Sequence, residues 1–230
     1  MNTAQKIIKY FAIAFAMLLI FSIFSGIIFG GFGLLTASNF LKTSNNAELS
    51  CSATEVPCLK ISLAFADLEI KSGDSLSASS NYDKIEIKQS DGELLIAERN
   101  GELFSDKSRK VTVYVPTDVE LKIVEIKGGA GRIEAEALKV DTFDASLGIG
   151  ETVIKSLDAK TAKLSTGIGK LSLNLVGPKD DYEIKAKKGI GKLTINGSDV
   201  SGSEPYGSGE RKVEVSGGIG DISITTKGEN

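Results

Sequence analysis

One short β unit occurs six times in this chain, and this repetition constrains the fold more than any other feature. Each unit is centred on a residue between two small ones, here called the origin, and the origins are Phe65, Ala130, Ile149, Ile168, Ile190 and Ile219. Ala64 and Ala66 flank the first origin. The other five are flanked by glycines, which are Gly129 and Gly131, Gly148 and Gly150, Gly167 and Gly169, Gly189 and Gly191, and Gly218 and Gly220.

Apolar residues alternate on both sides of each origin, but with opposite parity. In the first unit they stand two, four and six residues before the origin, at Leu63, Ile61 and Leu59. After the origin they stand three and five residues ahead, as at Leu171 and Leu173. Period-two alternation is typical of a strand with one buried face. A strand that changes parity must bend, and glycine allows the positive φ that such a corner needs. Each unit is therefore predicted to be strand, glycine corner, strand.

Units of this kind predict an all-β, stacked, solenoid-like domain, because one unit cannot bury its apolar face alone. The origins at 130, 149 and 168 are 19 residues apart, which suits two short strands and two turns. The later, longer intervals contain the loops 176–181 and 197–210, which are rich in Gly, Pro, Ser and Asp. Between the first two units, residues 85–96 predict a hairpin around a Ser-Asp-Gly turn. A strand over 111–115 should end at Pro116.

The N-terminal part has a different character. Residues 10–35 carry no charge, and this run exceeds the roughly 20 residues that span a bilayer. Lys6 and Lys9 precede it, which predicts a cytoplasmic N-terminus and places residues 43–230 outside the membrane. A cleaved signal peptide is the alternative, because Thr36, Ala37 and Ser38 offer small residues to a peptidase. The run is longer than a usual signal core, which favours an uncleaved single-pass anchor.

Small residues follow one face of this expected helix. Ser22, Gly26 and Gly30 are spaced four apart, which allows two membrane helices to approach closely and predicts a homo-oligomer. The alternative is that glycine is simply common in membrane helices.

Cys51 and Cys58 are the two cysteines of the chain. Outside the cytoplasm, such a close pair predicts a disulfide, which stabilises a small loop by about 2.5 kcal/mol. Metal binding would need further ligands, and the chain has no histidine.

Charge excludes some partners. Of the 27 basic residues, Lys6, Lys9 and Lys42 precede residue 43, which leaves 24 against 30 acidic ones outside the membrane. This net charge of about −6 favours solubility and gives no attraction to nucleic acid or anionic lipid.

The sequence shows no catalytic or cofactor motif. No phosphate-binding glycine pattern has the required spacing. Residues 217–222 approach a calcium-binding nonapeptide, but Ile222 occupies the ligand position and should point into the core. Asp180 and Asp181 form the adjacent acid pair of a Gly-Pro loop, where solvated turn residues are expected. Tyr206 could contact a partner or pack its ring on the end of the stack. We therefore expect no enzyme activity, cofactor or metal.

A charged or polar residue stands two positions after each origin. These residues are Asp67, Arg132, Glu151, Lys170, Lys192 and Asp221. If the units stack in sequence order, they form a ladder about 4.8 Å apart in which some neighbours have opposite signs. We expect these charges to form a solvated face that fixes the stacking order of the units. A binding site for a polyion would instead carry charges of one sign.

The hairpin, the strand that leads into residues 113–121 and the Gly-x-Gly units resemble the bacterial and archaeal putative-adhesin family, a domain-of-unknown-function family of toast-rack or β-solenoid type. The resemblance covers about residues 56–227 and implies no catalytic residues. The family's usual acidic or polar residue after the second glycine is matched by Glu151 and Asp221 but is lysine at Lys170 and Lys192.

We therefore predict three segments, which are a tip and anchor at 1–42, a linker at 43–55 and an extracytoplasmic β domain at 56–230. The predicted role is a non-enzymatic adhesion, interaction or envelope-scaffold module with a protein or cell-surface partner. A sensing or regulatory subunit of an envelope-stress system is the alternative. A carbohydrate-cleaving β-helix enzyme is a third hypothesis, and the mixed signs of the ladder argue against it.

Overall fold

The computed structural model describes residues 46–47, 58–90, 92–99, 108–201 and 204–227. Its contacts divide the chain into residues 1–40 and 41–230, and all described residues belong to the second unit. Within these residues the search for a helix long and apolar enough to cross a membrane finds none. The predicted anchor and linker, with Ser22, Gly26 and Gly30, lie outside the described residues.

The described part of the chain is all-β, as predicted, and one short 3-10 helix, η2, interrupts it. Alternating Val, Ile and Leu favour strands, and Gly, Pro and Asp favour the turns between them. The elements are β1 Asn46–Ala47, β2 Cys58–Leu63, β3 Asp67–Gly73, β4 Ser77–Ser80, β5 Ile85–Ser90, β6 Glu93–Glu98, β7 Lys110–Pro116, β8 Leu121–Ala135, β9 Leu138–Val176, η2 Lys179–Asp181, β10 Tyr182–Ile190, β11 Leu193–Ile195, β12 Ser198–Asp199, β13 Arg211–Ile219 and β14 Ile222–Lys227.

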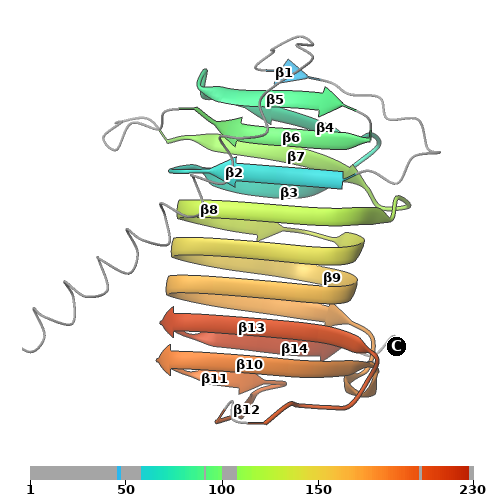
Figure 1. Cartoon of the computed structure of the whole chain (residues 1–230), viewed down its shortest axis with the longest axis vertical. Coiled ribbons are helices and arrows are strands. Elements are labelled where there is room, and N and C mark those ends of the chain that lie inside the picture. Colours follow the sequence, from blue (N-terminus) through green and yellow to red (C-terminus); the bar gives the residue numbers. More distant parts are fainter. Residues whose placement is uncertain (1–45, 48–57, 91, 100–107, 202–203, 228–230) are drawn as a thin grey trace, which may run out of the picture. The chain divides into compact units, whose positions relative to one another are not determined.

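The units lie one above another, and the strands of neighbouring levels are parallel and in register (Figure 1). Ala130 of β8 pairs with Ile149 of β9, and Ile168 of β9 pairs with Ile219 of β13. β9 has 39 residues, which at about 3.3 Å each would extend about 130 Å if the strand were straight. It turns back on itself instead, which Figure 1 shows as a folded ribbon. Each unit thus forms one level of the stack, with a strand on either side of the core.

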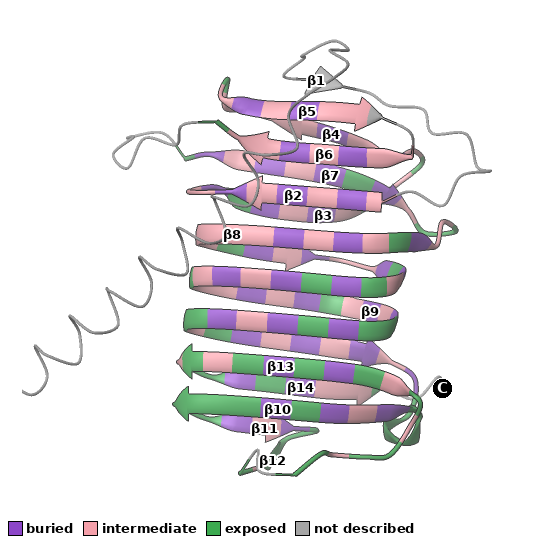
Figure 2. Cartoon of the chain, in the orientation of Figure 1, coloured by how far each residue is buried: buried purple, intermediate pink, exposed green. Residues whose placement is uncertain are grey.

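The core lies between these two layers of strands, and burial alternates along each strand (Figure 2). In β8, Ile126 before the corner and Ile133 after it are both buried, although they are an odd number of positions, seven, apart. No residue of 127–132 is buried. The predicted change of parity at the corner is therefore confirmed.

At the N-terminal end of the stack, β2 pairs with β6 and β3 with β7. β5 and β6 form the predicted antiparallel hairpin, in which Ile87 lies opposite Ile96. β7 ends at Pro116, as expected. These strands close this end of the core.

The levels do not follow sequence order throughout, which corrects the simplest expectation from the sequence. β13 and β14 lie between β9 and the level of β10 and β11, so the sixth unit is inserted between the fourth and the fifth. The loop 177–181 carries the chain past the level that β13 later fills. Arg211, the first residue of β13, donates to Tyr182 Oη at 2.9 Å and pairs with Asp158 at 2.9 Å, which ties three levels together.

The two glycines of a corner have different roles. The second one has a φ between 134° and 145° in all five glycine units, a region that side chains rarely adopt. A Cβ on Gly169 would also lie 1.6 Å from the Gly150 carbonyl oxygen. The first glycine is outside the positive-φ region, which corrects the prediction that both need it. A Cβ there meets the neighbouring level instead, as at Gly167, 2.4 Å from the Gly148 oxygen.

The first unit has alanine where the other units have glycine. At this corner the neighbouring group is the side chain of Glu98 and not the backbone of another corner, which leaves room for a methyl group. The Glu98 carboxylate accepts hydrogen bonds from the Ala64 and Phe65 amides at 2.7 and 2.9 Å. Its other oxygen pairs with Arg109 at 2.8 Å, and both side chains are almost completely buried. This pair satisfies the backbone donors of the first corner.

Candidate interaction surface

The glycine corners expose a row of apolar side chains along one edge of the stack. In spatial order the row, here called the apolar ridge, consists of the six origins Phe65, Ala130, Ile149, Ile168, Ile219 and Ile190. The exposed fractions of Ile149, Ile168 and Ile190 are 45%, 43% and 66%. These are three of the four exposed large hydrophobic residues in the described part of the chain, and Tyr114 is the fourth.

The corner explains this exposure. The parity change directs the origin outward, and its glycine neighbours have no side chains to cover it. Isolated exposed hydrophobics are ordinary, but a continuous row is a feature of contact surfaces. Phe65, Ala130 and Ile219 are half-buried, whereas Ile149, Ile168 and Ile190 are exposed, and this exposed part of the row suggests contact with another molecule.

A row of charges runs beside the ridge. The true order of levels makes this charge ladder alternate in sign at every step, as Asp67, Arg132, Glu151, Lys170, Asp221 and Lys192. If the units were stacked in sequence order, Lys170 would lie beside Lys192. The spatial order separates these two lysines by Asp221.

Contacts between levels support the predicted ordering role of the ladder. Arg132 and Glu151 pair at 3.0 Å. The Asp67 carboxylate accepts from the Arg132 amide at 2.9 Å, and Asp221 accepts from the Lys192 amide at the same distance. Both of these acids therefore fix a corner of the next level. Solvent-exposed pairs contribute little each, but several in one row favour one order of stacking.

Two further charges extend the ladder beside Arg132, namely Glu134 on the same level and Lys155 on the level of Glu151. Arg132 also pairs with Glu134 at 3.2 Å, and Lys155 binds the other oxygen of that carboxylate at 2.6 Å. The hydrogen bond from Lys155 holds the pKa of Glu134 below its usual range. Glu134 is therefore a carboxylate at neutral pH. The apolar ridge and the charge ladder lie side by side, and together they are called the corner face below.

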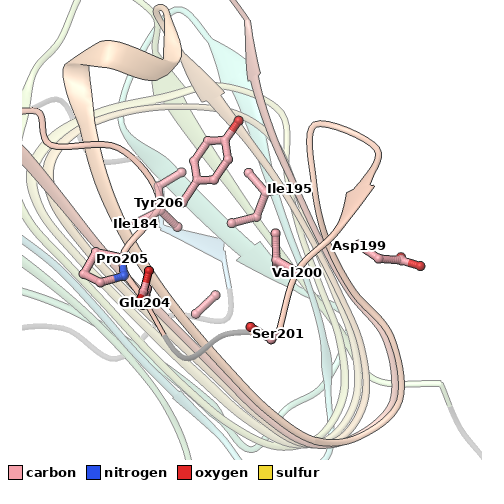
Figure 3. A pocket seen from close by; sticks show the side chains of 9 residues that line it. Ile184, Ile195, Asp199, Val200, Ser201, Glu204, Pro205 and Tyr206 are labelled. Carbon is pink, nitrogen blue, oxygen red and sulfur yellow. The ribbon is translucent and has the colours of Figure 1, made fainter.

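Apart from the corner face, the structure has a pocket at the β10 and β11 end of the stack (Figure 3). This pocket of about 350 Å³ is lined by Ile184, Ala186, Ile195, Asp199, Val200, Ser201, Glu204, Pro205 and Tyr206. Tyr206 exchanges two backbone hydrogen bonds with Ile184, each 2.8 Å long, and is partly buried against the core. Its ring therefore packs on the end of the stack, which was one of the two predicted roles.

Asp180 and Asp181 are exposed in η2, and Ile222 is buried in the core as predicted. Across the described residues, no cluster of three or more His, Cys, Asp or Glu side chains could hold a metal ion. Cys58 begins β2 and is half-buried, whereas Cys51 lies outside the described residues, so their disulfide stays a prediction.

No family model matches the sequence. No curated protein matches it either. Among solved structures, the chain is similar to a putative cell adhesion protein from Clostridium sporogenes, with 20% identity and a TM-score of 0.60, over 81% of this chain and 100% of that one. A putative adhesin from Bacteroides fragilis has 13% identity and a TM-score of 0.36, over 81% of this chain and 98% of that one. The likeness to the clostridial structure shows a shared fold.

Proposed function

We propose that this chain is a non-enzymatic adhesion or interaction module that a single-pass anchor presents outside the cell membrane. The corner face is the observation that carries the proposal, because three of its isoleucines, Ile149, Ile168 and Ile190, are exposed in one row. The fold shared with the putative cell adhesion protein from Clostridium sporogenes supports the same role. In this proposal the domain is a β-solenoid of toast-rack type, whose corner edge presents the corner face.

The location rests on the sequence. The uncharged run at 10–35 and the lysines before it favour an anchor with the β domain outside the membrane. The net charge of about −6 would keep this domain away from anionic lipid. A partner on another protein or another cell fits these properties better than the membrane surface does.

Attachment assays on cells test the role. Cells that produce the chain should attach to one another or to a surface more strongly than matched cells that lack it. Protease added to intact cells should digest the domain beyond residue 43. Unchanged attachment together with an altered envelope-stress response would contradict adhesion and favour the regulatory alternative.

A further inference from the structure

The charge ladder has a symmetry that becomes visible only in the true order of levels. Its signs run −, +, −, +, −, + from Asp67 to Lys192. Six alternating charges read in reverse have the opposite sign at every position. A ladder of this kind is therefore complementary to a second copy of itself that runs in the opposite direction.

We propose that the corner face binds the corner face of a second copy of this chain, antiparallel and about a two-fold axis. This inference rests on the proposed adhesive function and names its partner. The axis passes midway between the levels of Glu151 and Lys170. Each Glu151 then faces the partner copy's Lys170, Arg132 faces Asp221, and Asp67 faces Lys192. A parallel arrangement in the same register would place no ladder charge opposite one of opposite sign, so the charges also favour the antiparallel direction.

The apolar ridge fits the same axis. Ile149 faces the partner copy's Ile168, so four isoleucines meet at the centre of the contact. These two side chains are 45% and 43% exposed in one copy, and the contact would bury them. Towards the ends, Phe65 faces Ile190, and the small Ala130 faces Ile219. Apolar residues at the centre with charges beside them are the usual arrangement of a protein interface.

Charges within one copy do not fully explain this surface. Alternation between neighbouring levels stabilises the stack by itself, as the 3.0 Å pair of Arg132 and Glu151 shows. Burial in the stack is incomplete at Ile149, Ile168 and Ile190, which stay 43–66% exposed, and neighbouring exposed apolar side chains are a feature of contact surfaces. The apolar ridge and the alternating ladder are thus independent observations that fit one occupant.

The contact is small, and its size indicates how it acts. Six levels about 4.8 Å apart extend about 24 Å, so the buried area is below the roughly 1,200 Å² of a standard interface. One pair of copies should therefore associate weakly. Many copies on two facing surfaces would bind strongly, because multivalency multiplies weak contacts. The antiparallel direction suits this, since it places the two β2 strands, where each domain begins, at opposite ends of the pair.

A charge-swap experiment tests the proposal with full-length chains coupled through their N-termini to beads of two colours. Wild-type beads should cluster, and added salt should disperse them. Glu151→Lys and Lys170→Glu should each reduce clustering at least about tenfold, because two-fold symmetry doubles each like-charge contact. Beads that carry Glu151→Lys mixed with beads that carry Lys170→Glu should cluster again. In the mixed pair the introduced lysine meets the introduced glutamate, and the native Lys170 of one chain meets the native Glu151 of the other.

The mixed sample separates binding from folding. Each variant loses the alternation inside its own stack, but mixing cannot repair a misfolded chain, so clustering of the mixture alone supports the proposal. Lys122→Glu, an exposed charge reversal outside the ladder, is the control and should cluster like wild type. Single variants that cluster as well as wild type, or a mixture that stays dispersed, would overturn the inference. Dispersed wild-type beads together with attached cells would overturn it and leave the adhesive role standing.

Discussion

Substitution of Gly169 by alanine tests the corner geometry. Gly169 has a φ of 145°, where alanine is strained by about 1–3 kcal/mol. The new Cβ would also lie 1.6 Å from the Gly150 oxygen and 2.7 Å from its carbon. These atoms belong to the backbone of the next level, so relief requires the levels to separate, at a further cost of about 1–3 kcal/mol. We expect a total loss of about 2–6 kcal/mol in the free energy of unfolding.

Substitutions at two other glycines separate the cost of backbone strain from the cost of the close contact. Gly197 has a φ of 77° but open space around its Cβ position, so Gly197→Ala adds strain without a close contact. Gly167 is outside the positive-φ region but lies 2.4 Å from the Gly148 oxygen, so Gly167→Ala adds the close contact alone. Denaturant unfolding of the full-length chain, followed by circular dichroism, should show the largest loss for Gly169→Ala. A loss no greater than that of Gly197→Ala would refute close approach as the reason for glycine.

Three further perturbations test other parts of the fold. Glu98→Leu should cost about 3–5 kcal/mol because it leaves Arg109 buried without its carboxylate, and the double variant with Arg109→Leu should recover part of this loss in denaturant unfolding. Hydrogen bonds from two lysines lower the pKa of Glu183 to about 2, so its stabilising effect is full above the unfolded pKa of about 4.5 and is lost as the pH falls through 2. The difference in melting temperature between wild type and Glu183→Gln should therefore be present at pH 6 and disappear near pH 2; a constant difference would contradict this. Non-reducing mass analysis of protein from the envelope should find the Cys51 to Cys58 peptide two hydrogens lighter than its reduced form, and free thiols there would contradict an extracytoplasmic disulfide.

Much of the fold could be predicted from the sequence because the evidence is local. The alternation at Leu59, Ile61 and Leu63 and the glycines around each origin specify strands and corners residue by residue. The strands and corners form the same two-layer core whatever the order of the units in the stack, so the core could be predicted without knowing that order. The hairpin of β5 and β6 was also readable, since its turn residues separate two alternating runs.

The order of the last two levels could not be predicted from the same pattern. The fifth and sixth units carry the same template, so the pattern does not distinguish which of them follows the fourth in the stack. One signal was present, because sequence order would have placed Lys192 next to Lys170. Lys188 was another, since it occupies a position that is buried or glycine in most units, and it is exposed on the end level. The alternating corner face depends on this order, which is why the sequence alone did not reveal it.

The most direct test of the account combines Ile149→Ser and Ile168→Ser in cells that produce the chain. These changes remove the centre of the apolar ridge, and both positions are already partly exposed, so the fold should persist. Tyr114→Ser, which removes an exposed aromatic ring outside the corner face, is the matched control. With equal amounts of chain at the surface and equal melting temperatures, we predict that the double variant loses attachment and the control keeps it. Attachment of the double variant at the wild-type level would contradict the assignment of function to the corner face.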